Sequence, residues 1–222
     1  LEKAKEAFAF AASGWSDDLG GGIYWRQGDY STKNTCSNAP AAVLAVQLYQ
    51  ATGDPAYLDW ALKILDWLKV LRPPDQGAFW DNLSRDGRID PSAFTYNTGA
   101  ALHAYALLYA STGRPEYLEE ARGLARASLA EFAPSRGADL PRLFPPHPWF
   151  NAVLLRGYLA LWDVDPQKDP TYLDAMRVYL DYAWQHARGA DGFFAPNPQG
   201  GQASNRWILD QSGWLEMYAL LE

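Results

Sequence analysis

The sequence predicts an all-α fold of the (α/α)6-barrel type, in which amphipathic helices surround buried helices. Three observations support this expectation. A pattern containing a Tyr-Leu pair, at residues 57, 117 and 172, recurs every 55 to 60 residues, which is enough chain for two helices and a loop. Amphipathic segments alternate with segments that are apolar nearly all round. Apart from the short stretches GGIYW and GAFWDN, no segment has the period-two pattern of a strand.

The repeated pattern marks the amphipathic helices, which we expect to form the outer layer. Within each copy, Pro lies where a first helical turn tolerates it, and apolar residues recur at i, i+3, i+4 and i+7. The first residues, LEKAKEAFAF, fit the same repeat. The other copies begin at Ala51 (ATGDPAYLDWALKILDWL), Ser111 (STGRPEYLEEARGLARASL) and Asp169 (DPTYLDAMRVYLDYAWQHA).

Four other segments predict buried helices, because a helix that is apolar on all faces is buried on all faces. TGDP and TGRP form short turns at one end of the barrel, and long loops lie at the other end. The polar first turns of the buried helices therefore converge on the long-loop end. The four segments begin at Asn38 (NAPAAVLAVQLYQA), Thr95 (TYNTGAALHAYALLYAS), Trp149 (WFNAVLLRGYLALW) and Asp210 (DQSGWLEMYALLE).

The first ten residues also indicate what lies upstream. Because the repeat is already under way at Leu1 and no cap precedes it, we expect the chain to be N-terminally incomplete. A closed barrel of six helix hairpins would need about three or four further helices upstream. We expect residues 1–222 to belong to a single barrel domain.

Composition excludes several classes of function. The net charge is −7 and Lys and Arg are scattered, so nucleic acid is not an expected partner. No apolar run approaches the ~18 to 20 residues that span a bilayer. A single cysteine, Cys36, rules out an internal disulfide. The three histidines, at positions 103, 147 and 186, have no metal-ligand spacing, so neither a metal nor another cofactor is expected.

Aromatic residues make up 14% of the chain, including ten Trp and thirteen Tyr. Many must belong to the core, but Trp and Tyr beside Asp, Asn and Gln also suit a sugar cleft, where sugar faces stack on rings and hydroxyls form hydrogen bonds. The residues that we expect to contact a sugar at the long-loop end are Asp17, Asp18, Tyr24, Trp25, Lys33, Asn34, Asp81, Tyr96, Asn97, Asn151 and Gln211.

Several of these residues have a structural alternative. Tyr24 and Trp25 could pack under the glycine loop, Lys33 could be a solvated charge, and Asn34 could cap a helix. Asn38 is expected to be the cap of the buried helix that it begins. Gly99, next to Tyr96 and Asn97, permits the close approach of backbone or of a ligand.

The stretch SGWSDDLGGGIYW raises the question of a catalytic carboxylate pair, because Asp17 and Asp18 lie side by side between tryptophans. Retaining hydrolysis of a glycoside needs two carboxyl groups about 5 to 5.5 Å apart, one of them protonated in a dry site. Because this pair precedes three glycines in a loop, we expect it to be wetter and to line a subsite or shape the turn. Asp81, in FWDN, is the best candidate for a further carboxylate near the cleft. The alternative is that Asp81 only shapes a loop turn.

A succession of motifs covers nearly the whole chain: GWSDDLGGGIYW, TKNTCSNAPAA, YLDWALKILDWL, FTYNTGAALHAYALLYASTG, FNAVLLRGYLA and LDQSGWLEMYALL. In these motifs and their order the chain resembles glycoside hydrolase family 76. That family contains bacterial and fungal α-1,6-mannanases, including fungal cell-wall proteins that act on GPI-anchored mannoproteins. The resemblance implies an (α/α)6 barrel and endo-acting hydrolysis of α-1,6-mannan with retention of configuration.

The resemblance also implies where catalysis takes place. The family's catalytic residues are two consecutive aspartates at the start of an inner helix, about one outer helix before the GGGIYW loop. No such pair lies between Leu1 and Ser13. We therefore expect the catalytic pair upstream of Leu1, and we expect Asp17 and Asp18 to form part of a subsite.

The expected partner is mannan or a mannose-containing oligosaccharide, and the expected state is a monomer. A polymeric substrate is met outside the cytoplasm, so we expect a secreted protein or one of the cell envelope, in the periplasm or at the surface. Two alternatives stay open at this point. One is a non-catalytic carbohydrate-binding barrel. The other is a different sugar enzyme with an α/α barrel, of the unsaturated glucuronyl hydrolase or N-acylhexosamine epimerase type, although the histidine positions do not suggest the epimerase.

Overall fold

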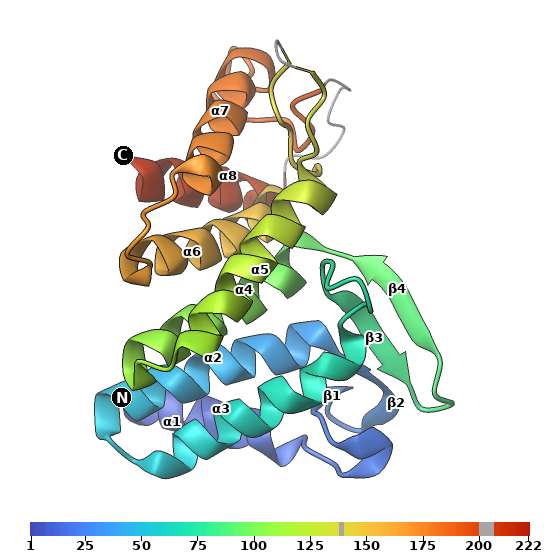
Figure 1. Ribbon diagram of the computed structural model, residues 1–222. Helices are drawn as coiled ribbons and strands as arrows, with labels where there is room; N and C mark the ends of the chain where they lie inside the picture. Colours follow the sequence, from blue (N-terminus) through green and yellow to red (C-terminus); the bar gives the residue numbers. More distant parts are fainter. Residues whose placement is uncertain (138–139, 200–206) are drawn as a thin grey trace.

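The computed structural model describes residues 1–137, 140–199 and 207–222, and its helices alternate between two layers (Figure 1). This alternation confirms the order predicted from the repeat. The outer layer consists of α1 (Glu2–Ser13), α3 (Pro55–Leu68), α5 (Pro115–Phe132) and α7 (Thr171–His186). The inner layer consists of α2 (Thr35–Thr52), α4 (Thr95–Thr112), α6 (Pro148–Val164) and α8 (Ile208–Leu221).

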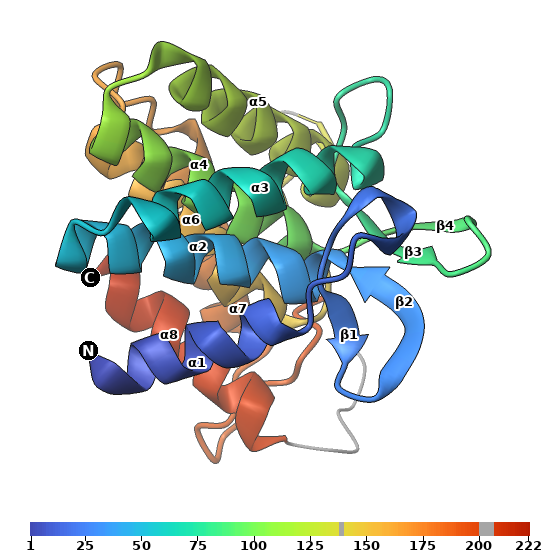
Figure 2. The ribbon, with the colours of Figure 1, turned by 90° about the horizontal axis from the view of Figure 1, so that it is seen from below.

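The inner helices pack against one another in chain order, α2 against α4, α4 against α6 and α6 against α8. Each outer helix covers the inner layer: α1 and α3 pack on α2, α5 on α4, and α7 on α6 (Figure 2). The contacts follow from the sequence pattern, since α4 is apolar nearly all round and buries Ala101, Leu102, Ala104 and Leu108 completely. The described helices therefore form an arc of two concentric layers.

Glycines permit the closest contact in the inner layer. A Cβ atom built on Gly99 of α4 would lie 2.5 Å from the Cα atom of Leu154 in α6. A Cβ atom on Gly157 of α6 would in turn lie 2.6 Å from the carbonyl oxygen of Gly99. The close approach expected at Gly99 is therefore an approach of backbone, and it brings the N-terminal half of α4 directly onto α6.

The turns between α2 and α3 and between α4 and α5 follow the predicted TGDP and TGRP signals. Gly53 and Gly113 adopt left-handed conformations, with φ of 72° and 67°, and each ends the preceding helix. Pro55 and Pro115 then occupy the first positions of the following helices. These short turns lie at one end of the layers, so the longer connections and the starts of the inner helices lie at the opposite end.

A four-stranded antiparallel sheet covers the long-loop end beside α2 and α4, with strand order β1-β2-β3-β4. The sequence shows a strand-like pattern only in the short stretches GGIYW and GAFWDN, whereas the structure joins four strands in one sheet, because β2 pairs with β3 with Asn34 opposite Asn82. The strands are β1 (Tyr24–Arg26), β2 (Asp29–Asn34), β3 (Trp80–Ser84) and β4 (Ile89–Ala93), and two 3-10 turns span Asp18–Gly20 and Lys69–Leu71. Since β2 runs directly into α2, the sheet places its side chains at the start of an inner helix.

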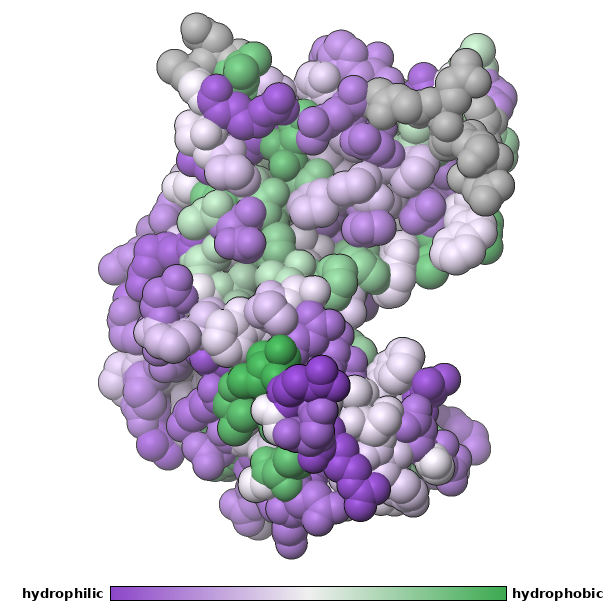
Figure 3. Space-filling view, turned by 90° about the vertical axis from the view of Figure 1, so that its right-hand side faces the viewer, coloured by the Kyte–Doolittle hydropathy of each residue, from purple (hydrophilic) through white to green (hydrophobic). Residues whose placement is uncertain are grey.

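Figure 3 shows a face that is hollowed on one side, with hydrophobic residues grouped near its middle and hydrophilic residues around them. Large apolar side chains are exposed on α1 and α8, which form the two ends of the arc; Phe10 is 62% exposed and Leu215 is 71% exposed. Among the described residues, no helix combines the length and the apolar character that a membrane crossing requires.

An ion pair joins the two layers at the end of α6. Arg122 of α5 donates hydrogen bonds from Nη2 and Nε to the two carboxyl oxygens of Asp165, at 2.6 and 2.9 Å. Asp165 is only 4% exposed. The hydrogen bonds from Arg122 lower the pKa of Asp165, although burial acts in the opposite direction.

We expect Asp165→Asn to lower the free energy of unfolding at pH 7 by about 3 kcal/mol, because it removes the buried charged partner of a largely buried guanidinium and leaves only the exposed Glu119. Since the folded-state pKa of Asp165 is depressed, its contribution is present above the unfolded value of ~3.9 and is lost as the pH falls through the folded value. Urea unfolding at pH 7 and pH 3 measures both effects. Glu119→Gln, at an exposed carboxylate that contacts the same arginine, is the control and should cost less than ~1 kcal/mol. An equal loss in the two variants would contradict the expectation.

Candidate functional site

The centre of the long-loop end is the carboxylate of Asp81, in β3. Its Oδ1 accepts a hydrogen bond from Asn97 Nδ2 of α4 at 3.0 Å. Its Oδ2 accepts from Asn82 Nδ2 at 3.0 Å and from Asn34 Nδ2, directly before α2, at 3.3 Å. Three amide groups, two from the sheet and one from the inner helix α4, therefore donate to one carboxylate.

Two weak acids lie close to this carboxylate and are kept protonated. Burial, and secondly the negative charge of Asp81, raise the pKa of the Cys36 thiol to about 11. The same two causes raise the pKa of the Tyr96 hydroxyl above its ordinary value. Asn97 is completely buried, and its Oδ1 has no hydrogen-bond donor among the described residues. The site thus combines one anionic acceptor with neutral groups that can donate or accept hydrogen bonds.

Aromatic side chains from the starts of α4 and α6 form a wall beside Tyr96. The rings of Tyr96 and Trp149 are nearly parallel, with centroids 6.2 Å apart, and Phe150 packs edge-on against Tyr96 at 4.2 Å. The ring of Phe94 is also nearly parallel to that of Tyr96, with centroids 5.6 Å apart. Flat, partly exposed rings beside hydrogen-bonding groups are the combination that a sugar requires, since its faces are apolar and its edges polar.

The SDDLGGG segment forms a compact loop at the edge of the sheet. Asp17 and Asp18 are both exposed to solvent. Asp17 Oδ1 accepts a hydrogen bond from Trp15 Nε1 at 2.9 Å, and Asp18 Oδ2 accepts one from the Tyr24 hydroxyl at 3.3 Å. Lys33 is completely buried, and its ammonium group donates only to backbone carbonyls of this loop. Lys33 is therefore part of the loop's framework, and all three of its N–H groups are used.

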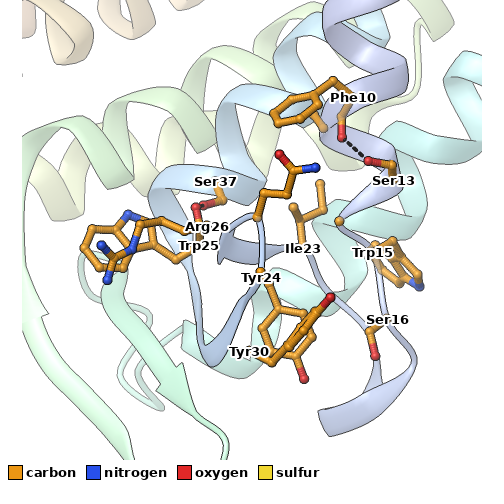
Figure 4. A pocket seen from close by; sticks show the side chains of 14 residues that line it. Phe10, Ser13, Trp15, Ser16, Ile23, Tyr24, Trp25, Arg26, Tyr30 and Ser37 are labelled. Carbon is orange, nitrogen blue, oxygen red and sulfur yellow. Dashed lines mark hydrogen bonds between the residues drawn. The ribbon is translucent and has the colours of Figure 1, made fainter.

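A pocket of about 390 Å³ adjoins this loop, between the end of α1 and the β1–β2 hairpin (Figure 4). In this view Trp25 lies on one side of the pocket and Trp15 on the other, while the rings of Tyr24 and Tyr30 lie against each other. The guanidinium of Arg26 lies 4.3 Å above the ring of Trp25. Trp25 is 48% exposed and presents its ring to solvent, whereas Tyr24 is buried. Of the two predicted aromatic contacts in β1, Trp25 is the accessible one.

Two further predicted site residues link segments of the framework. Asn151 of α6 is completely buried; its Oδ1 accepts from Thr95 Oγ1 of α4 at 2.9 Å, and its Nδ2 donates to the carbonyl of Pro145 at 2.8 Å. Gln211 of α8 forms two hydrogen bonds with the backbone of Phe194. Both residues lie at the predicted helix starts, but their amides are already paired within the protein.

The predicted cap at Asn38 is wrong. Helix α2 begins at Thr35, so Asn38 lies inside it and is completely buried. Its side chain accepts from the backbone N–H of Ile23 at 2.8 Å and donates to the carbonyl of the same residue at 2.9 Å. The amide of Asn38 therefore pairs with the backbone of Ile23, just before β1, in the way that a neighbouring strand would. An asparagine in this role and an asparagine that caps a helix look the same in the sequence.

The structure brings Asn34, Asp81, Tyr96 and Asn97 together, as predicted, and places Asp17, Asp18, Tyr24 and Trp25 around the neighbouring loop and pocket. It adds Asn82, Cys36 and Trp149, which the sequence analysis did not include among the site residues. Asn82 directly follows Asp81, and Cys36 lies two positions after Asn34. Their closeness to predicted site residues along the chain is the signal that could have identified them. Trp149 stood at a predicted helix start beside Asn151.

Alternating inner and outer α-helices, with polar and aromatic side chains gathered at the starts of the inner helices, are typical of the α/α-barrel class of proteins. Comparison with known families agrees with this class: the glycosyl hydrolase family 76 model matches residues 1–192. The chain belongs to glycosyl hydrolase family 76, as its motifs indicated.

Two curated relatives come from yeasts. The mannan endo-1,6-alpha-mannosidase DCW1 of Candida glabrata is 30% identical over 127 residues, which cover 53% of this chain and 28% of that protein. The protein of the same name from Saccharomyces cerevisiae is 30% identical over 143 residues, which cover 60% of this chain and 32% of that protein. The matched region is therefore less than a third of each relative's length.

Solved structures match the whole chain. A family 76 glycoside hydrolase from a bovine Bacteroides thetaiotaomicron strain has a TM-score of 0.90 and 32% identity, and the match covers 50% of that chain. The family 76 α-1,6-mannanase of Salegentibacter sp. HEL1_6 has a TM-score of 0.85 and 30% identity, and the match covers 69% of that chain. An inactive variant of the latter, with two consecutive aspartates replaced by alanine, was solved in complex with α-1,6-mannotetrose. The fold is thus that of the family's α/α barrels.

Proposed function

We propose that this chain is part of an endo-acting hydrolase of α-1,6-mannan that retains the anomeric configuration. The observation that carries the proposal is the Asp81 carboxylate, held by three amides and bordered by the Tyr96 and Trp149 rings, in a member of family 76. Relatives that the chain matches bear the names of mannan endo-1,6-alpha-mannosidase and α-1,6-mannanase. Together these support a mannan or mannose-containing oligosaccharide as the substrate.

Within this proposal the residues divide by what they can offer a sugar. Asp81 accepts hydrogen bonds from sugar hydroxyls, and Tyr96 and Trp25 supply faces for stacking. Asn34 and Asn97 keep the carboxylate in place. Lys33, Asn151 and Gln211 hold the loop and the helix starts in position, because their polar groups are paired within the protein.

The proposed catalytic pair is a set of two consecutive aspartates upstream of Leu1. The inactive relative with two consecutive aspartates replaced supports a pair of this kind. Asp17 and Asp18 are exposed to solvent, whereas a general acid needs a site that excludes water. We therefore assign Asp17 and Asp18 to the rim of the cleft. Because mannan is a polymer met outside the cytoplasm, we also propose a secreted or cell-envelope protein, and we propose that it acts as a monomer.

The test is incubation of the full-length protein with linear α-1,6-mannan. We expect release of α-1,6-linked oligosaccharides of several lengths, which distinguishes endo-acting cleavage from release of single mannose units. Proton NMR of the first products should show the α-anomer, because retention proceeds through a covalent intermediate. Amylose is the control substrate and should stay intact. Binding of mannan without any hydrolysis would instead favour a carbohydrate-binding protein.

The same assay tests the assignment of the exposed pair. The double variant Asp17→Asn, Asp18→Asn should keep measurable hydrolysis, with the larger change in KM, because rim contacts bind substrate and transition state alike. If hydrolysis fell to the uncatalysed level while mannan binding stayed intact, these two aspartates would be the catalytic pair.

A further inference from the structure

The glycine loop is built around the ammonium group of Lys33. Its Nζ atom donates to the carbonyl oxygens of Ser16, Asp18 and Gly21, at 2.7, 2.5 and 2.6 Å. A lysine ammonium has three N–H donors, so these contacts use its full capacity. Lysine is almost never completely buried unless its charge is compensated, and Lys33 has no exposed surface at all.

The surroundings of the ammonium resemble a site for a small cation. Three carbonyl dipoles of one short segment point at a single positive charge, and the Tyr24 ring lies 4.7 Å from it on another side. Burial lowers the pKa of Lys33, while the negative charges of Asp18 and Asp17 raise it. No carboxylate contacts Nζ directly among the hydrogen bonds of the described chain, so compensation comes from carbonyl dipoles and from charges at longer range.

The shape of the loop requires unusual backbone conformations. Gly21 and Gly22 have φ of 123° and 93°, and a Cβ atom on them would lie 2.7 Å from the Trp15 ring and 2.5 Å from the Trp67 ring. Leu19 has a φ of 59°, which is unfavourable for a side chain of its size. The inward-facing carbonyls of this segment need hydrogen-bond donors at its centre, and the Lys33 ammonium supplies them.

Lys33 also connects this loop to the carboxylate at the centre of the site. It lies in β2, paired with Tyr24 of β1 and with Leu83 of β3. The next residue, Asn34, donates to Asp81. Strand β2 thus contacts the loop through the side chain of Lys33 and contacts Asp81 through the side chain of Asn34. The positions of Asp17 and Asp18 relative to Asp81 depend on this connection through Lys33.

We propose that Lys33 is a positioning residue that acts as a covalently attached cation: its ammonium group organises the Ser16–Gly22 loop and thereby sets Asp17 and Asp18 at the rim of the glycan cleft. The inference rests on the proposed function in so far as the rim contacts a glycan. The organisation of the loop by the ammonium does not depend on it.

The experiment removes the ammonium and then returns it. Lys33→Ala deletes the stem and the charge, and propylammonium replaces the deleted atoms. Lys33→Met keeps a stem of similar size without charge or donors, so it serves as the second variant if the alanine variant does not fold. Lys69→Met, at an exposed lysine that contacts Asp66, is the matched control. Hydrogen exchange of the loop amides and the KM and kcat for α-1,6-mannooligosaccharides are measured in the full-length protein.

We expect the loop amides of Lys33→Met to exchange at least about tenfold faster than in the wild type, while amides of α2 and β3 are unchanged. KM should rise roughly tenfold with a smaller change in kcat, because the rim binds substrate away from the reacting bond. Propylammonium should restore loop protection in Lys33→Ala, whereas propan-1-ol and tetramethylammonium, which lack the charge or the N–H donors, should not.

Unchanged loop exchange in Lys33→Met, or equal effects of propylammonium and propan-1-ol, would overturn the inference. A wild-type protein that does not hydrolyse mannan would contradict the proposed function, while the exchange measurement would still decide the role of Lys33.

Discussion

Replacing Asp81 by Asn in the full-length protein is expected to lower kcat/KM for α-1,6-mannooligosaccharides by about 10²- to 10³-fold. The carboxylate accepts amide hydrogen bonds from Asn34, Asn82 and Asn97. An asparagine presents an NH₂ group to part of this set, so at least one donor is left unpaired. The negative charge that we propose to face the sugar hydroxyls is also lost. Loss of charge-assisted hydrogen bonds of this kind costs about 3 to 4 kcal/mol in the transition state, which corresponds to this decrease in rate.

The matched control is Asp86→Asn in the β3–β4 turn. Asp86 is an exposed carboxylate that pairs with Arg88 next to it, at 2.7 Å, and it takes no part in the site. Its removal should change kcat/KM by less than about twofold. Thermal unfolding of both variants shows whether they are folded. The assignment of Asp81 fails if the Asp81 variant keeps activity close to the wild type, or if both variants lose the same amount.

Gly99→Ala is expected to destabilise the protein by about 3 kcal/mol or more, which is large for the addition of one methyl group. The added Cβ atom would lie 2.5 Å from the Cα atom and 2.8 Å from the N atom of Leu154. Both atoms belong to the backbone of α6, so no side-chain rotation relieves the overlap, and α4 and α6 must separate. Denaturant unfolding followed by circular dichroism measures the loss.

Gly123→Ala provides a control of opposite sign. Gly123 also lies within a helix, α5, but a Cβ atom there would meet only the guanidinium of Arg126, at 4.0 Å. Because alanine favours the helix over glycine, this variant should gain about 0.5 to 1 kcal/mol. If both glycines responded alike to alanine, helix propensity alone would explain them and the close contact between α4 and α6 would not limit stability.

The layered helical fold could be predicted from the sequence because each helix carries its own local signals. The apolar pattern, Pro55 and Pro115 at the helix starts, and Gly53 and Gly113 at the helix ends all act within a few residues. The predicted helix starts were less accurate, since α2 begins at Thr35 and not at Asn38. The sequence pattern at Asn38 is that of a cap, but its side chain is hydrogen-bonded to Ile23, which lies outside the helix.

The candidate site could be predicted in part. Asn34, Asp81, Tyr96 and Asn97 were expected together because loops at one end of a two-layer helical fold must meet there. The pairing of β2 with β3, which brings Asn34 and Asp81 within hydrogen-bonding distance, was not expected. Short strands of mixed composition have no periodic signal of their own, and their partners are chosen by contacts between residues far apart in the chain.

The amino-acid sequence by itself determined the order of the helices, which of them are buried, the end of the molecule where polar residues gather, and membership of family 76. These properties depend on local periodicity, turn residues and motif order. The tertiary structure alone decided which polar side chains face the cleft and which are used internally. Lys33 and Asn151 look like sugar contacts in the sequence, yet their N–H groups donate to backbone carbonyls and, for Asn151, also to the Tyr179 hydroxyl. The physical reason is that a buried polar group must find its partner within the folded chain, and that partner is not local.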